Sequence, residues 1–169
     1  MTNRKAITKF LSELLINRFN MKRTYWASEV TLDYGTKDVK RVDFMQFEPA
    51  NQMSISGIEK GIFTCYEIKS CKADFNSGFG RNFIGDKNYF VMTMETYLEV
   101  IHEIPHNVGV LVTVPIFTDL YDQFENPKHI DELNLQTEYW ELKVIQPAHT
   151  QDRKRSMVEL LFCMLRSGK

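Results

Sequence analysis

The hydrophobic residues of this chain recur with two different periods. Near the N-terminus, Ile7, Phe10, Leu11, Leu14 and Leu15 are spaced as on one face of an amphipathic helix. Later segments are instead rich in β-branched and aromatic residues and are bounded by turn-forming residues, as strands are. In chain order the pattern predicts a helix over 3–19, strands over 24–33, 39–48, 61–70 and 88–93, a helix over 94–104, strands over 108–114 and 139–145, and a helix over 152–166.

Two of these strands differ in polarity, and the difference predicts their places in a sheet. Residues 108–114 are almost entirely apolar, as in a central strand that is buried on both faces and that can pair in parallel after a helical crossover. Residues 139–145 alternate apolar and charged side chains, which indicates one wet face and a place nearer the edge. In the long connection 115–138 we expect a short helix begun by Asn126 and Pro127. The pattern as a whole predicts an α/β fold, a mixed sheet with helices on both faces.

Composition narrows the class of protein. The 169 residues are 43% hydrophobic and 25% charged, and they suffice for one domain, which we place at 1–169. No apolar run approaches a membrane span, and the charged, helix-spaced N-terminus is unlike a signal peptide, so we expect no membrane association. Three sparse cysteines indicate reduced thiols and a cytoplasmic location. The net charge of −1 means that any nucleic-acid binding must come from local patches.

Three charged residues interrupt otherwise apolar predicted strands. Glu67 and Lys69 are two residues apart, so on a strand they point to the same face. If strands 39–48 and 61–70 pair, Asp43 stands beside Glu67, with Lys69 next to both. Two converging carboxylates are costly unless a cation or a proton neutralises them. Oxygen ligands of this kind suit Mg²⁺ or Mn²⁺, and a neighbouring lysine can orient or deprotonate a water.

An Asp on one strand and a Glu-x-Lys on the next resemble the active-site signature of the PD-(D/E)XK nuclease superfamily, whose small stand-alone MmcB-like DNA repair proteins look nearest. This sequence departs from that pattern in two ways. Val42, not proline, precedes Asp43, and a glycine-rich insert lies between Asp74 and Asp86. The matched residues are Asp43, Glu67, Lys69, Ser70, Asp74, Phe75, Asp86 and Lys87.

This resemblance implies a restriction-endonuclease-like fold and a hydrolase that cuts phosphodiester bonds of nucleic acid, DNA above all, in repair, recombination or phage DNA metabolism. It implies Mg²⁺ or Mn²⁺ held by Asp43, Glu67 and the backbone carbonyl of Ile68, with Lys69 positioning the attacking water. Many nucleases of this fold pair to cut both strands, so a homodimer is a candidate assembly. The alternative is a nuclease-fold module without catalytic activity that binds nucleic acid or a protein partner.

Other acidic residues are candidates for an auxiliary role at such a site. Glu13 lies at the margin of the first helix's apolar stripe, where it could lean into a metal site or pair with Lys9 in solvent. Glu29 could be a further acid or an outward-facing strand residue. Asp74 and Asp86 complete the set of auxiliary acids that the resemblance suggests.

Residues 71–88 form a loop with several glycines and cations that does not complete a phosphate-binding P-loop. It could track a nucleic-acid backbone, with Arg81 and Asn82 touching phosphate or base edges. It could equally be a surface loop anchored in the core by Phe79 and Phe83. The predicted nucleic-acid contacts of the chain are Lys72, Arg81, Asn82, Lys87, Arg153, Lys154 and Arg155.

The start of the last predicted helix carries an unfavourable charge pattern. Asp152 is a suitable N-cap, yet Arg153, Lys154 and Arg155 would then fill the first turn, where cations oppose the helix dipole. Either the acidic stretch 119–141 neutralises this turn, or the turn binds a nucleic-acid phosphate.

One motif points to different chemistry. Residues 102–106 match the H-E-x-x-H pattern of zinc hydrolases, which needs both histidines on one face of a continuous helix. Pro105 disfavours a helical Ile104 and ends the helix there, so His102 and His106 would not share a face. We therefore set the zinc interpretation aside.

Overall fold

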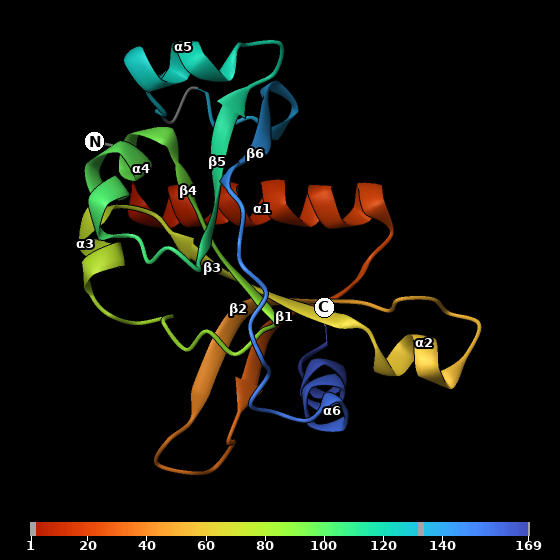
Figure 1. Cartoon of the computed structure of the whole chain (residues 1–169). Helices are drawn as coiled ribbons and strands as arrows, with labels where there is room; N and C mark the ends of the chain where they lie inside the picture. The colour runs from red at the N-terminus through yellow and green to blue at the C-terminus, as the bar shows by residue number, and fades with distance from the viewer. Residues whose placement is uncertain (1–2, 132–133, 169) are drawn as a thin grey trace.

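The computed structural model describes residues 3–131 and 134–168, and in it the chain forms one six-stranded mixed sheet with helices around it (Figure 1). The strands are β1 (Tyr25–Leu32), β2 (Lys40–Glu48), β3 (Ile62–Lys69), β4 (Lys87–Thr93), β5 (Gly109–Pro115) and β6 (Trp140–Gln146). The helices are α1 (Arg4–Lys22), α2 (Ile55–Glu59), α3 (Lys72–Asn76), α4 (Met94–Val100), α5 (Leu120–Glu125) and α6 (Met157–Ser167), with 3₁₀ turns η1 (Ile101–Glu103) and η2 (Thr137–Tyr139).

The strands lie side by side in the order of the sequence. β1, β2 and β3 form an antiparallel meander, β4 and β5 continue in parallel to β3, and β6 closes the sheet as an antiparallel edge. β5 is buried along nearly its whole length, as its unbroken apolar run predicts, and the alternating β6 is an edge strand, as predicted. The predicted α/β class is confirmed, and the arrangement is consistent with a restriction-endonuclease-like fold.

The two faces of the sheet are covered by different helices. α1 lies across the strands on one face (Figure 1), where its apolar stripe packs against side chains such as Tyr66, Ile68 and Val91. On the opposite face, α6 packs over β1–β3 and α4 packs over β4 and β5, each with its own apolar cluster. Because side chains alternate along a strand, Glu67 and Lys69 point to this second face. They therefore lie between the α6 cluster and the α4 cluster.

The predicted loop 71–88 begins with the short helix α3. Two predicted helix positions were also wrong because local signals were ranked incorrectly. The last helix begins at Met157 rather than near residue 152, since the hydroxyl of Ser156 caps it by accepting from the Glu159 N–H. The helix in the long connection is α5, which is capped by Asp119 and lies before the Asn–Pro pair instead of after it. A proline just past a helix ends it as readily as one at the start begins it.

The segment around the H-E-x-x-H pattern behaves as predicted. α4 is capped by Thr93, whose hydroxyl accepts from Thr96 N–H, and it passes into the 3₁₀ turn η1. Ile104 then adopts an extended conformation ahead of Pro105, so the two histidines do not share a helical face. Across the described ranges, no helix combines the length and the apolar character that a bilayer crossing requires.

Candidate active site

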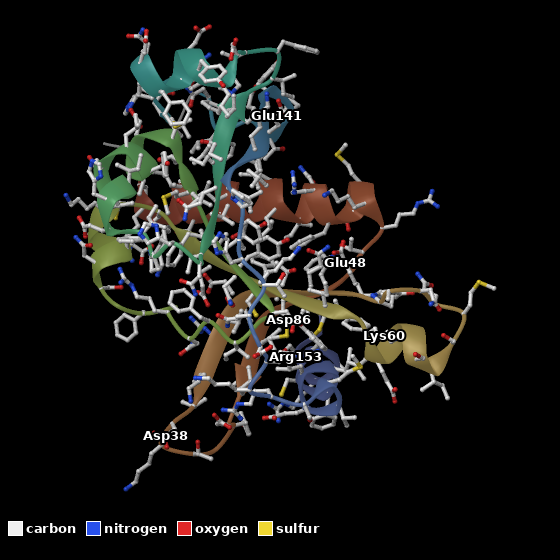
Figure 2. The ribbon with its side chains drawn as sticks, in the orientation of Figure 1. Asp38, Glu48, Lys60, Asp86, Glu141 and Arg153 are labelled. Atoms are coloured by element: carbon white, nitrogen blue, oxygen red, sulfur yellow. The ribbon has the colours of Figure 1, made fainter. Side chains whose placement is uncertain are left out.

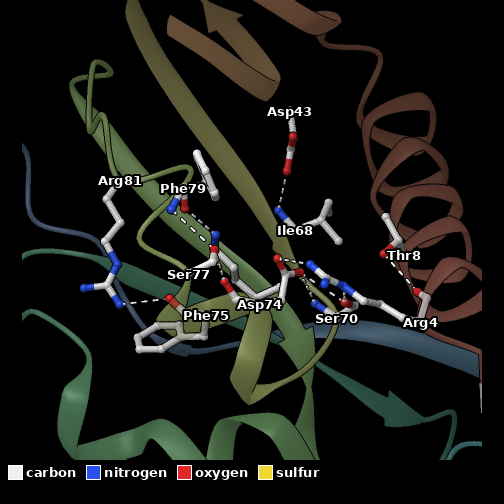
Figure 3. Close-up of polar contacts among 11 residues, drawn as sticks. Arg4, Thr8, Asp43, Ile68, Ser70, Asp74, Phe75, Ser77, Phe79 and Arg81 are labelled. Atoms are coloured by element: carbon white, nitrogen blue, oxygen red, sulfur yellow. Dashed lines mark hydrogen bonds and ion pairs between the residues drawn. The ribbon is translucent and has the colours of Figure 1, made fainter.

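The candidate site is formed where β2 separates from β3. The antiparallel pairing of the two strands ends at Phe44 and Tyr66. One residue further along, the Asp43 side chain accepts a hydrogen bond from the Ile68 backbone N–H, 2.8 Å from N to Oδ2 (Figure 3). A carboxylate thus takes the place of the missing backbone partner, while β3 stays paired with β4 as far as Lys69. The divergence gives Asp43 and the end of β3 room for a cavity.

Glu67 is buried in this cavity with only 9% of its surface exposed. Burial, and then the neighbouring Asp43 carboxylate, raise the pKa of Glu67 from 4.5 to about 9, although the Lys69 ammonium opposes the shift. Without a bound cation, Glu67 therefore keeps its proton at pH 7 and hydrogen bonds to Asp43. The two carboxylates adjoin, as predicted from their places on neighbouring strands.

Lys69 is buried as well, and its ammonium is held by the loop 77–86 between α3 and β4, called the glycine loop below. The Nζ donates to the backbone carbonyl of Phe79 at 2.6 Å and lies 5.9 Å from the centre of the Phe90 ring. Gly80 lies directly against the two buried side chains at φ +69°, where a Cβ would clash with the Glu67 carboxylate and press on the Lys69 ammonium. The loop can approach this closely only because it carries glycine there.

These residues line a cavity of about 440 Å³ that is bounded by β2, β3, α3 and the glycine loop. The lining residues are Val39, Lys40, Arg41, Asp43, Glu67, Ile68, Lys69, Asp74, Gly78, Phe79, Gly80 and Asn82. Two cations of this set, Lys40 and Arg41, were missed in the sequence. They directly precede Val42-Asp43, so their nearness to the acid could have been read from the strand pattern.

Asp74 is present at the edge of the cavity but is already engaged. Its carboxylate accepts from the backbone N–H and the hydroxyl of Ser70, and it pairs with Arg4 at 2.6 Å (Figure 3). Arg4 also donates to the Ser70 hydroxyl, which ties the start of α1 to the end of β3. Asp74 therefore supports the site by fixing the chain after Lys69.

The other three auxiliary acids do not line the cavity. Glu13 pairs with Lys9 on the exposed side of α1, which is the second of the two interpretations given above. Glu29 is an exposed residue of β1 at φ +53° that pairs with Arg41. Asp86 lies at the opposite end of β3, where its side chain accepts from the Phe63 N–H. The structure thus brings one of the four auxiliary acids, Asp74, to the site.

Of the predicted nucleic-acid contacts in the loop, Asn82 lines the cavity and donates to the Arg41 carbonyl. Arg81 stacks on the Phe75 ring at 4.6 Å and donates to the Phe75 carbonyl (Figure 3). Lys72 lies on α3, 3.9 Å from Glu103.

Lys87 and the two phenylalanines of the loop do not fully follow either interpretation of the loop. Lys87 lines a separate small polar cavity beside α1, with Arg18 and Tyr66. The alternative of two anchored aromatics is half right, because Phe83 packs against Phe90 whereas Phe79 is exposed.

The cations before α6 have partners that neither interpretation named. Arg153 stacks over Phe63 and lies 3.4 Å from Asp86 (Figure 2 labels both charged residues). Arg155 makes a forked pair with Asp33 and also reaches Glu159. Because these residues precede the helix, the predicted dipole conflict does not arise. Lys154 is exposed beside them.

The site offers few protein ligands for a divalent ion. Across residues 3–131 and 134–168 there is no cluster of three or more His, Cys, Asp or Glu placed to hold a metal. Mg²⁺, however, commonly takes one or two carboxylates from a protein and keeps several waters. The adjoining carboxylates of Asp43 and Glu67, beside the Ile68 backbone, fit that smaller requirement.

Comparison with known proteins bears on the fold. No protein-family model and no curated protein matches this chain. Among solved structures, a protein of unknown function from Silicibacter pomeroyi is similar over 95% of this chain and 82% of its own, with a TM-score of 0.56 and 16% sequence identity. A likeness at that identity shows a shared α/β fold and carries no information about the chemistry of this chain.

Proposed function

We propose that this protein is a Mg²⁺- or Mn²⁺-dependent nuclease that hydrolyses phosphodiester bonds of nucleic acid, with DNA as the expected substrate. The observation that carries the proposal is the convergence of Asp43, Glu67 and Lys69 in one cavity where β2 leaves β3. Burying two carboxylates side by side costs stability, which either a proton or a cation offsets, and a divalent cation can use both carboxylates as ligands.

Each residue of the trio has a distinct role in the proposed chemistry. Asp43 and Glu67 would hold the ion, with the Ile68 carbonyl as a third ligand. When bound, a divalent ion supplies Lewis-acid stabilisation of the phosphoryl oxygens. Lys69 would orient the attacking water and offset negative charge in the transition state, because its ammonium has two further N–H donors besides the one that binds the Phe79 carbonyl.

The rim of the cavity suits a polyanion. Lys40 and Arg41 line it. The ion pair of Arg41 with Glu29 is exposed, so a phosphate can compete there with the carboxylate, whereas the pair of Lys40 with Asp33 is partly buried. Because the net charge of the chain is −1, nucleic-acid binding has to come from a local patch of cations, and these two residues provide one. Repair, recombination or phage DNA metabolism, a cytoplasmic location and a homodimer all stay predictions.

The test is a cleavage assay on purified protein with circular single-stranded and double-stranded DNA, and with RNA, in Mg²⁺, Mn²⁺ or EDTA. Asp43→Asn, Glu67→Gln and Lys69→Met should each lower the rate at least about 100-fold while the protein stays folded. Matched substitutions at exposed positions, Glu59→Gln and Lys60→Met, should leave the rate unchanged. Wild-type cleavage in Asp43→Asn, or full activity in EDTA, would overturn the proposal.

One observation favours the second candidate, a module without catalytic activity. The raised pKa of Glu67 and the hydrogen bond from Lys69 to Phe79 leave the buried charges satisfied without any ion. Such a module would bind nucleic acid or a protein equally well with metal or EDTA and would cleave nothing. Binding whose strength ignores metal, together with no cleavage in Mn²⁺, is the result that favours it.

A further inference from the structure

Phe79 stands out in the glycine loop because its ring is exposed while its backbone is fixed. It lies between Gly78 at φ +78° and Gly80 at φ +69°, and 80% of its surface is exposed. Its carbonyl accepts from the Lys69 ammonium. Its N–H donates to the Ser77 hydroxyl (Figure 3). The loop thus presents an aromatic ring at a defined place.

The surroundings of the ring indicate what it contacts. A single exposed apolar side chain is ordinary on a protein surface, so exposure alone decides nothing. Phe79, however, lines the cavity that holds Glu67 and Lys69, and the same cavity carries Lys40 and Arg41 at its rim. An aromatic ring beside cations is the combination with which proteins bind single-stranded nucleic acid, the ring stacking on a base and the cations contacting phosphates.

We propose that Phe79 is a stacking platform for the base next to the phosphate that is cut, so that the substrate is single-stranded or locally unpaired nucleic acid. In a duplex both faces of each base are covered by its neighbours, and exposing one face costs a few kcal/mol. A free strand offers the face without that cost. The hydrogen bond from the Lys69 ammonium to the Phe79 carbonyl holds Phe79 next to Lys69, the residue proposed to position the attacking water.

This inference deepens the proposed function, and it is tested by binding so that the two can fail separately. Phe79→Trp places an exposed indole in the loop, whereas Trp26 and Trp140 are buried. A base stacked on the indole should quench its fluorescence. Phe162→Trp, on the exposed side of α6, is the matched control because Phe162 is 59% exposed and does not line the cavity.

Each variant is titrated with a single-stranded oligonucleotide and with a blunt duplex of the same sequence, in EDTA and again in Ca²⁺. We expect quenching of the Phe79→Trp protein by the single strand and little by the duplex, with no quenching of the Phe162→Trp control. Phe79→Ala should weaken single-strand binding by about 10-fold, within the roughly 5- to 150-fold range of one lost stacking contact. Duplex binding should change less.

Three results would overturn the inference: binding without quenching, unchanged single-strand affinity in Phe79→Ala, or no binding of either oligonucleotide in either buffer. Quenching without cleavage in any metal would leave Phe79 as the base-stacking residue of a single-strand-binding module and refute the nuclease. Cleavage that persists in Phe79→Ala with an unchanged KM for single strands would refute the platform and leave the nuclease standing.

Discussion

Glu67→Gln should make the metal-free protein more stable at neutral pH. Glutamine has nearly the shape of a protonated glutamate, so it can keep the contact with Asp43 without any need for a proton. In the wild-type protein, burial and the Asp43 charge raise the Glu67 pKa to about 9, whereas the unfolded chain has the ordinary value of 4.5. The folded state therefore binds a proton that the unfolded state has released at pH 7.

The sign and size of the effect follow from proton linkage. The stability associated with the Glu67 proton is fully present below pH 4.5 and falls as the pH rises toward 9. At pH 7 the wild-type protein has lost about 3 kcal/mol, since each pH unit above the unfolded pKa costs about 1.4 kcal/mol. The glutamine variant avoids this loss, and for a chain of this length its Tm should be higher by roughly 6–12 °C.

Thermal and urea unfolding in EDTA at pH 5, 7 and 8.5 test the reasoning. The advantage of Glu67→Gln should be small at pH 5 and should grow at each step, while Glu59→Gln at an exposed position should follow the wild type throughout. A stability difference that does not change with pH would refute the assignment of the proton to Glu67. Asp43→Ala should not stabilise in the same way, because it leaves the Ile68 N–H without its acceptor, which costs about 1–3 kcal/mol.

Two further predictions concern the loop and the ion pair beside α6. Gly80→Ala should cost clearly more stability than Gly78→Ala in urea unfolding, since both have positive φ but only the first would press a Cβ on Glu67; equal losses would show that backbone strain is the whole effect. Arg155 lowers the Asp33 pKa to about 2, so Arg155→Ala should be less stable at pH 7, and the deficit should shrink as the pH falls from about 4 toward 2. A deficit that persists below pH 2 would assign the effect to packing.

The strand pattern was readable because it depends on local rules. Side chains alternate along a strand, and an unbroken apolar run such as that of β5 can be stable only when both faces are covered. The charged trio was readable for the same reason, since a charge in an apolar strand is costly wherever the strand lies. Asp43, Glu67 and Lys69 were therefore identifiable as a group before their contacts were known.

Only the tertiary structure decided which polar groups pair with each other when they lie far apart in the chain. Arg155 meets Asp33 across 122 residues, and Asp86 meets Phe63 across 23, so no local periodicity could separate these acids from the site. The role of Gly80 likewise depends on a loop folding back onto Glu67. Local spacing sets which face a residue occupies, whereas the choice among several like-charged partners depends on which segments the packed sheet brings together.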